Sequence, residues 1–234
     1  MKLVMLPGMD GTGRLFERLI RLFPPEIEPF IIPLPTAGAQ SPVALAQSIR
    51  KLLPNQEPYF LLGESFSGRI AFEIANDNSS LLKGVIYAAS FLSAPKLARV
   101  PVPPFIQLKQ LLRLPGISSV GKYFTVGSKS NNQVWLEIVD SIGKVQNSTL
   151  MARLKALRQL KDPLKTNDKR SLSLIPEQDR LVDKDAFTTL EINCTSLVQK
   201  TIAGPHFILQ INPQECASQI ARFITRETAK EQSQ

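Results

Sequence analysis

The sequence Gly63-Glu64-Ser65-Phe66-Ser67-Gly68 follows directly on the apolar run Tyr59-Phe60-Leu61-Leu62. That run is typical of a buried β-strand, and from Ile70 onward apolar residues return with helical spacing. A serine therefore stands at the tip of a sharp turn between a strand and a helix. Small residues flank it on both sides, as a close approach of the two backbones requires.

This arrangement of strand, turn and helix with a serine at the tip is the nucleophile elbow, usually written G-x-S-x-G. Here the pattern is G-x-S-x-S-G, because Ser67 stands where the second glycine is usual. Glycine and serine also form turns that carry no chemistry. The stretch alone leaves two interpretations open, a catalytic nucleophile at Ser65 and a purely structural turn.

Strand-like and helix-like segments alternate on both sides of this turn. We expect strands near 2–6, 30–34, 59–62, 85–89, 171–175 and 196–202, and helices near 15–23, 41–53, 69–77, 184–191 and 213–225. Residues 226–234 are expected to form a frayed polar tail. Strands that are apolar on both faces predict an α/β fold, a mostly parallel sheet with helices on both faces. Ligands bind such sheets beyond the carboxyl ends of the strands.

The alternation stops between residues 95 and 170. Amphipathic stripes predict three helices there, at 105–112 (ending before Pro115-Gly116), 135–142 and 150–160. We therefore expect a core of residues 1–94 and 171–234, with a helical cap (lid) inserted as residues 95–170. Arg153, Lys155, Arg158 and Lys161 fall outside the apolar stripe of the third helix.

The inserted segment is basic. It contains 14 Lys and Arg residues against 4 Asp and Glu, whereas the rest of the chain contains 14 against 16. A solvated helical surface explains this excess, and so does a patch that attracts an acidic carrier protein or an anionic surface. Nucleic acid is not favoured as a partner, because aromatic residues make up only 7% of the chain and are not interleaved with the basic ones.

Composition excludes several other classes. No apolar run approaches the roughly 20 residues of a membrane-spanning helix, so no transmembrane segment is expected. Cys194 and Cys216 are far from any CxxC spacing, which favours neither a disulfide nor zinc and indicates a reducing, cytoplasmic location. A single histidine with two scattered cysteines does not make a metal site.

Three residues at the ends of predicted strands have the chemistry of a catalytic triad. Ser65 needs a base, and His206, the single histidine of the chain, follows the last predicted strand. The base needs an acid that fixes its tautomer. Asp179, directly after a buried strand, is favoured over Asp183 and Asp185, and Asp183 also fits the cap of the next helix.

Acyl transfer also requires backbone amides that stabilise a developing oxyanion. One is expected from Phe66, the residue after the serine, and the other from the first loop between a strand and a helix, where Met9 is the candidate. The glycines of segment 8–13 raise the alternative of a phosphate-binding loop. Neither GxxxxGK[ST] nor GxGxxG spacing is present, so nucleotide binding is not favoured.

These segments together resemble the α/β-hydrolase superfamily over nearly the full chain. The resemblance rests on four stretches in order: Leu-Pro-Gly-Met-Asp-Gly-Thr-Gly (6–13), Gly-Glu-Ser-Phe-Ser-Gly (63–68), Glu-Gln-Asp-Arg-Leu-Val (177–182) and Gly-Pro-His-Phe (204–207). It implies that Ser65 is the nucleophile, Asp179 the orienting acid and His206 the base, with Met9 and Phe66 as oxyanion donors.

The same resemblance implies that 95–170 is the cap domain and that the first antiparallel hairpin of the family is missing. Pro7-Gly8 stands where the family often has His-Gly. The expected activity is hydrolysis of a small-molecule carboxylic ester or thioester through an acyl-enzyme, without a cofactor. Acyl transfer or C–C bond hydrolysis on the same triad, and a non-catalytic binding protein of this fold, are the alternatives.

Overall fold

The computed structural model describes residues 1–77, 79–100, 103, 106–112, 114–127 and 132–232. Within them lies one six-stranded sheet in which every pair of neighbouring strands is parallel. The strand order is β2-β1-β3-β4-β5-β6. The strands are β1 (Lys2–Leu6), β2 (Glu28–Ile31), β3 (Tyr59–Glu64), β4 (Leu82–Ala88), β5 (Ser171–Pro176) and β6 (Leu197–Ile202).

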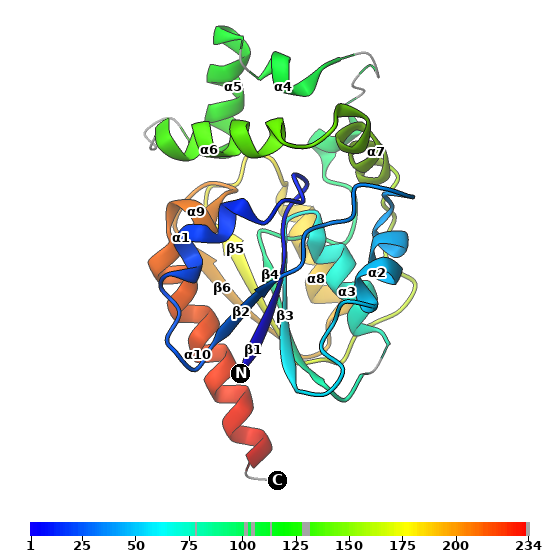
Figure 1. Cartoon of the computed structure of the whole chain (residues 1–234), viewed down its shortest axis with the longest axis vertical. Helices are drawn as coiled ribbons and strands as arrows, with labels where there is room; N and C mark the ends of the chain where they lie inside the picture. The colour runs from blue at the N-terminus through cyan, green and yellow to red at the C-terminus, as the bar shows by residue number, and fades with distance from the viewer. Residues whose placement is uncertain (78, 101–102, 104–105, 113, 128–131, 233–234) are drawn as a thin grey trace.

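Helices cover both faces of the sheet, as the sequence predicts (Figure 1). One apolar cluster joins the sheet to α2 (Pro42–Arg50), α3 (Ser67–Ala75) and α8 (Lys184–Asn193). The other joins it to α1 (Glu17–Ile20), α9 (Ile208–Ile211) and α10 (Pro213–Gln232). In β1, Val4 and Leu6 enter the first cluster whereas Leu3 and Met5 enter the second, because successive strand residues point to opposite faces.

The segment between β4 and β5 forms mainly helices. They are the short η2 (Lys96–Arg99), α4 (Leu108–Leu111), α5 (Pro115–Thr125), α6 (Asn132–Gly143) and α7 (Asn147–Arg158). In Figure 1, α4, α5 and α6 lie above the carboxyl ends of the strands. The first predicted helix does end before Pro115, since α4 ends at Leu111. The sequence pattern did not indicate the next helix, α5, which begins at Pro115, a position where proline is favoured. Residue 105 of the first predicted helix lies outside the described residues.

Two further expectations are corrected. Residues 226–232 are not a frayed tail but the last turns of α10. Glu227 holds them, since its buried carboxylate pairs with Lys230 at 2.8 Å and with Arg170 at 3.6 Å. The second strand ends earlier than expected, at Ile31, because the chain then turns toward the loop after β1, where the Leu34 amide donates to the Gly11 carbonyl.

The helix start predicted at residues 41–42 is confirmed, because the Ser41 hydroxyl accepts a hydrogen bond from the Ala44 amide at the beginning of α2. Among the described residues, no helix is long and apolar enough to cross a membrane.

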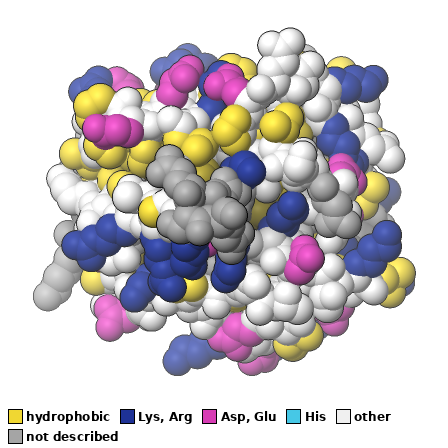
Figure 2. Space-filling model, turned by 90° about the horizontal axis from the view of Figure 1, so that it is seen from below, with side chains coloured by type: hydrophobic (Ala, Val, Ile, Leu, Met, Phe, Trp, Pro, Cys, Tyr) yellow, Lys and Arg dark blue, Asp and Glu magenta, His cyan; other side chains and the backbone are white. Residues whose placement is uncertain are grey.

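Basic side chains are not confined to the side of the molecule that carries α4–α6. Figure 2 shows the opposite end, where Lys and Arg side chains gather among acidic and apolar ones. Part of the basic segment reaches that end, since Lys169 donates to the Ser79 carbonyl and Arg170 pairs with Glu227. The positive charge that the sequence concentrates in one segment is therefore divided between two ends of the fold.

Candidate functional site

Ser65 lies directly after β3 and has a backbone φ of 50°, in the left-handed region that residues other than glycine seldom adopt. Its neighbours leave no room for larger residues. A Cβ atom on Gly68 would lie 2.3 Å from the Ser90 Cβ, and one on Gly63 would lie 2.6 Å from the Ser67 carbonyl oxygen. The glycines are therefore required by close packing, and the strained turn presents the Ser65 hydroxyl at the carboxyl edge of the sheet.

The structure brings together the three residues that the sequence places at separate strand ends. His206 Nε2 lies 2.9 Å from Ser65 Oγ, and His206 Nδ1 lies 2.7 Å from Asp179 Oδ2. A carboxylate at Nδ1 requires the proton on that nitrogen, so Nε2 is left to accept the serine hydroxyl proton. The side chains of His206 and Asp179 are almost fully buried.

Asp179 is held in place by its own loop. Its Oδ1 accepts hydrogen bonds from the amides of Leu181 and Val182, both at 2.9 Å, so Oδ2 remains for the histidine. The rival acids point elsewhere. Asp183 Oδ2 accepts from the Lys96 amide at 2.7 Å and makes no capping hydrogen bond to α8, and Asp185 pairs with the Lys96 ammonium at 2.6 Å.

The two amides predicted as oxyanion donors belong to the turn of Ser65 and to the loop after β1. Phe66 N belongs to the turn itself, and Met9 lines the same cavity as Ser65 and His206. Among the described residues, no hydrogen bond is donated by either amide. Both N–H groups are therefore available to a ligand.

The contacts of Ser67 show why serine is suited to this position, where the usual pattern has glycine. It is fully buried, and its hydroxyl donates a hydrogen bond to the Pro7 carbonyl in the loop after β1. A glycine at this position could not make that contact. The residue that weakens the sequence motif therefore ties the turn of Ser65 to the loop of Met9.

Arg153 of α7 is a residue whose role the sequence does not reveal. It falls outside the apolar stripe, yet it is 0% exposed. Its guanidinium donates to the carbonyls of Met9 at 2.9 Å and Asp10 at 3.1 Å. It also donates to Leu34 O, Pro35 O and Gln40 Oε1. Burial lowers its pKa, which the nearby Asp10 opposes. The sequence does not reveal this role because Arg153 is far in sequence from the loop that it holds.

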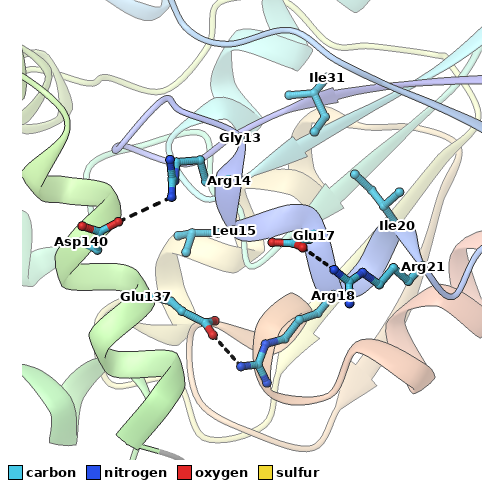
Figure 3. Close-up of a pocket in the computed structure, with 10 residues that line it drawn as sticks. All are labelled: Gly13, Arg14, Leu15, Glu17, Arg18, Ile20, Arg21, Ile31, Glu137 and Asp140. Carbon is cyan, nitrogen blue, oxygen red and sulfur yellow. Dashed lines mark hydrogen bonds and ion pairs between the residues drawn. The ribbon is translucent and has the colours of Figure 1, made fainter.

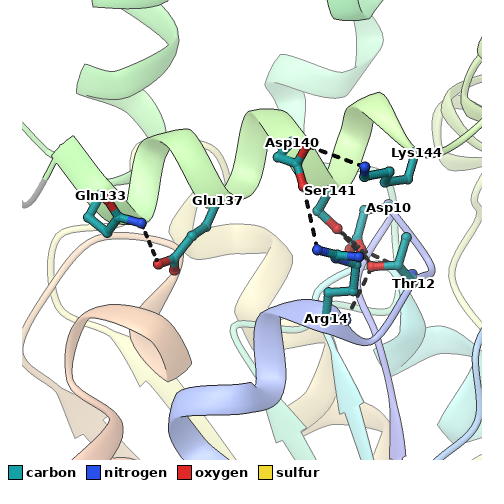
Figure 4. A network of polar contacts seen from close by, with 8 residues as sticks. All are labelled: Asp10, Thr12, Arg14, Gln133, Glu137, Asp140, Ser141 and Lys144. Atoms are coloured by element: carbon teal, nitrogen blue, oxygen red, sulfur yellow. Dashed lines mark hydrogen bonds and ion pairs between the residues drawn. The ribbon is translucent and has the colours of Figure 1, made fainter.

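Helix α6 contacts the same loop through a polar network (Figure 4). The Ser141 hydroxyl donates to Asp10 Oδ2 at 2.7 Å, and the same oxygen accepts from the amide and hydroxyl of Thr12. The neighbouring pocket between residues 13–21 and α6 is lined by the ion pairs of Arg14 with Asp140 and of Arg18 with Glu137 (Figure 3). Helices α6 and α7 thus fix the loop that carries Met9.

Glu64, the residue before the serine, is a buried carboxyl group. Its Oε2 accepts from the Gly8 amide at 3.2 Å and its Oε1 from Gln210 Nε2 at 2.9 Å. Burial raises the pKa of Glu64 to about 7, although the hydrogen bonds from Gln210 and Gly8 act in the opposite direction. Asp10 raises this pKa further by repulsion.

An apolar cavity of about 340 Å³ opens at Ser65 and His206. About half of its lining residues come from the segment between β4 and β5, namely Leu112, Gly121, Thr125, Trp135, Ile138, Ile142, Leu150 and Leu154. A second hollow of about 190 Å³ meets the same serine and histidine from the side of Phe91, Pro95 and Leu97. The site therefore suits apolar groups on either side of a bond held at Ser65.

The described residues contain no group of three or more His, Cys, Asp or Glu side chains that could hold a metal ion. Cys194 and Cys216 are buried free thiols, and burial raises their pKa values to about 11 and about 12. Neither thiol lines the cavity at Ser65.

No protein-family model matches the chain, and no curated protein matches its sequence. Solved structures do match it. The peroxisomal α/β-hydrolase Lpx1 of Saccharomyces cerevisiae has a TM-score of 0.70 at 16% identity, over 98% of this chain and 78% of that one. The esterase EaEST of Exiguobacterium antarcticum has a TM-score of 0.75 at 13% identity, over 96% of this chain and 92% of that one. The chain has the α/β-hydrolase fold.

A thioesterase shares this fold with the chain as well. The RedJ thioesterase of the prodiginine biosynthetic pathway in Streptomyces coelicolor has a TM-score of 0.70 at 16% identity, over 95% of this chain and 90% of that one. The α/β-hydrolase fold supports many activities, so the activity has to be argued from the site itself.

Proposed function

We propose that this α/β-hydrolase-fold protein is a serine hydrolase that cleaves a carboxylic ester or thioester through an acyl-enzyme on Ser65. The observation that carries the proposal is the chain of hydrogen bonds from Asp179 through His206 to Ser65, at 2.7 and 2.9 Å. That chain ends in an apolar cavity. Esterases and thioesterases among the solved structures with this fold are consistent with the activity.

In the first half of the reaction, His206 Nε2 takes the Ser65 proton while Oγ bonds to the carbonyl carbon. Asp179 stabilises the imidazolium that forms. The carbonyl oxygen gains negative charge, which the amides of Met9 and Phe66 stabilise. His206 then gives its proton to the departing alcohol or thiol as the carbon–oxygen or carbon–sulfur bond breaks. Water repeats the sequence on the acyl-enzyme and releases the acid, with Ser65 restored.

The segment 95–170 is proposed as a cap on the core of residues 1–94 and 171–234. It supplies about half of the residues that line the cavity, and its helices α6 and α7 are hydrogen bonded to the loop of Met9. In this proposal the cap encloses the acyl group and excludes water from it.

Docking of an acidic carrier protein or anionic surface on the cap is a secondary proposal. Internal contacts use part of its positive charge, because Arg153 is buried, Arg158 donates to two backbone carbonyls and Lys96 pairs with Asp185. If docking contributes, the rate of hydrolysis of a carrier-linked substrate should fall with rising ionic strength more steeply than that of a free ester. Equal salt dependence of the two substrates would remove this proposal.

The test of the main proposal is labelling with a fluorophosphonate probe, located by peptide mass spectrometry. We expect the wild type to be labelled on Ser65, and Ser65→Ala and His206→Ala to remain unlabelled. The probe needs no assumption about the substrate. A folded wild type that is not labelled would contradict the proposal and favour a binding protein, whereas labelling without release of acid would favour acyl transfer.

A further inference from the structure

Glu64 is one of two buried carboxyl groups, with Asp10, that line the cavity and that the proposed mechanism does not use. It is 5% exposed and directly precedes Ser65. Among the described residues no Lys or Arg forms an ion pair with it. A carboxyl buried without a cation is costly in its charged form, so its retention beside the nucleophile calls for a physical reason.

Its two oxygens join two separate segments of the site. Oε2 accepts from the Gly8 amide, next to Met9 in the loop after β1. Oε1 accepts from Gln210 in α9, which begins two residues after His206. One side chain thus connects the strand that carries the nucleophile, the loop of a proposed oxyanion donor and the segment that carries the base.

Gln210 is suited to both protonation states of this carboxyl. Its Nε2 donates to the ionised form and, at 3.4 Å, to the Leu15 carbonyl, while its Oε1 is buried and has no hydrogen-bond partner among the described residues. Rotation of the amide by half a turn brings Oε1 to face Glu64, where it accepts the proton of the neutral acid. A carboxyl that gains and loses a proton therefore keeps a partner in either state, although the rotated amide gives up its contact with the Leu15 carbonyl.

Three titratable groups act on this carboxyl from the elements around it. Asp10 in the loop after β1 repels its negative charge, whereas a positive charge on His206 favours it. The Cys216 thiol of α10 experiences the Glu64 charge in turn. Because the attraction between Glu64 and His206 is mutual, an ionised Glu64 stabilises the imidazolium that forms when His206 takes the serine proton.

We propose that Glu64 is a positioning residue of this site, whose ionised carboxyl holds the Gly8 amide and Gln210 in place and supports the positive charge on His206. Gain of a proton by Glu64 then slows acylation while the triad itself stays assembled. This proposal rests on the proposed hydrolase function in one respect, because its kinetic test measures ester hydrolysis.

The experiment compares kcat and KM for a soluble ester between about pH 5.5 and pH 8 in wild type, Glu64→Gln and Glu227→Gln. Glutamine matches the shape of Glu64 without its charge. We expect Glu64→Gln to lower kcat about tenfold near pH 8, less than loss of an oxyanion donor itself. The difference should vanish near pH 5.5, because the wild-type carboxyl is then neutral as well. Glu227 is a buried carboxyl at the far end of α10, so Glu227→Gln should follow the wild type.

Gln210→Leu provides a second variant that retains Glu64. Loss of the Gln210 hydrogen bond removes a contact that favours the ionised form of Glu64, so the pKa of Glu64 should rise. The pH below which activity declines should therefore be higher in Gln210→Leu than in wild type. A Glu64→Gln variant that is equally slow at every pH, or as fast as wild type at every pH, would overturn the proposal. The first result would indicate a structural role alone, and the second no role.

Difference infrared spectroscopy separates this proposal from the hydrolase function. A carboxylic acid band that titrates close to pH 7 in wild type and is absent from Glu64→Gln would support the assignment even if no ester is cleaved. If the wild type hydrolyses esters and that band is missing, the proposal for Glu64 fails while the proposed function stands.

Discussion

At the scale of single residues, Asp179 and Asp183 show how geometry decides between similar candidates. Both follow β5 closely in sequence, and either could orient a histidine. Asp179 Oδ2 contacts His206, whereas Asp183 Oδ2 accepts from the Lys96 amide. The carboxylate that contacts His206 is therefore set by the direction in which a short loop turns the side chain, which local sequence patterns do not encode.

Asp179→Asn should lower kcat by about 10⁴-fold with KM little changed, because an amide favours the wrong histidine tautomer. Asp183→Asn is the matched control, and it should keep activity within a factor of about two, since among the described residues its carboxylate contacts Lys96 and not His206. Steady-state kinetics on a chromogenic ester measures both. A large loss in Asp183→Asn with none in Asp179→Asn would reverse the assignment.

Ser67→Ala should remove the hydrogen bond to Pro7 and leave a buried carbonyl without its donor, at a cost of about 1–3 kcal/mol in the free energy of unfolding. Since that bond ties the loop of Met9 to the turn of Ser65, kcat should also fall more than KM rises. Urea denaturation and kinetics test this, with the exposed Ser48→Ala in α2 as the control. An unchanged free energy of unfolding in Ser67→Ala would mean that the hydrogen bond to Pro7 does not stabilise the fold.

At the scale of elements, helices α6 and α7 hold the loop after β1 from above. Ser141 reaches the Asp10 carboxylate, and Arg153 reaches the carbonyls of Met9 and Asp10. Gly11 leaves the space for this guanidinium, since a Cβ there would lie 2.3 Å from Arg153 Nη1. The helices proposed as a cap therefore hold the loop proposed to carry an oxyanion donor, and they also line the cavity.

Arg153→Leu should lower the free energy of unfolding by roughly 3 kcal/mol or more, because several buried carbonyls lose their donors together. Arg153→Lys should recover part of that loss, since an ammonium has donors but lacks the planar fork that reaches five acceptors. Denaturation gives the stabilities, and the rate of fluorophosphonate labelling of the folded protein reports on the loop. Labelling at the wild-type rate in both variants would show that Arg153 does not order the loop that carries Met9.

At the scale of the whole molecule, the sequence predicts what depends on local pattern. Strands that are apolar on both faces indicated the parallel sheet, and the elbow around Ser65 indicated where its ligand site lies. The contacts of Arg153, Ser67 and Glu64 escaped prediction because their partners lie between 56 and 146 residues away. The frayed tail was predicted from polarity alone, and the ion pairs of Glu227 that hold it as helix depend on the folded arrangement.

The stability of the whole fold should depend on the protonation of one residue. The pKa of Glu64 is raised from 4.5 to about 7, so the folded protein binds a proton that the unfolded chain has already released in this interval. Stability from this group is fully present below pH 4.5 and is lost as pH rises through about 7, in total about 3 kcal/mol. Burial raises the pKa values of Cys194 and Cys216 to about 11 and about 12, well above this pH interval. The pKa of Asp185 is lowered by Lys96 and so stays below the interval. Urea midpoints between about pH 5 and pH 8 should therefore fall more in wild type than in Glu64→Gln, where the group cannot titrate. Parallel pH profiles for the two proteins would show that Glu64 is ionised throughout, against the effect expected from its burial.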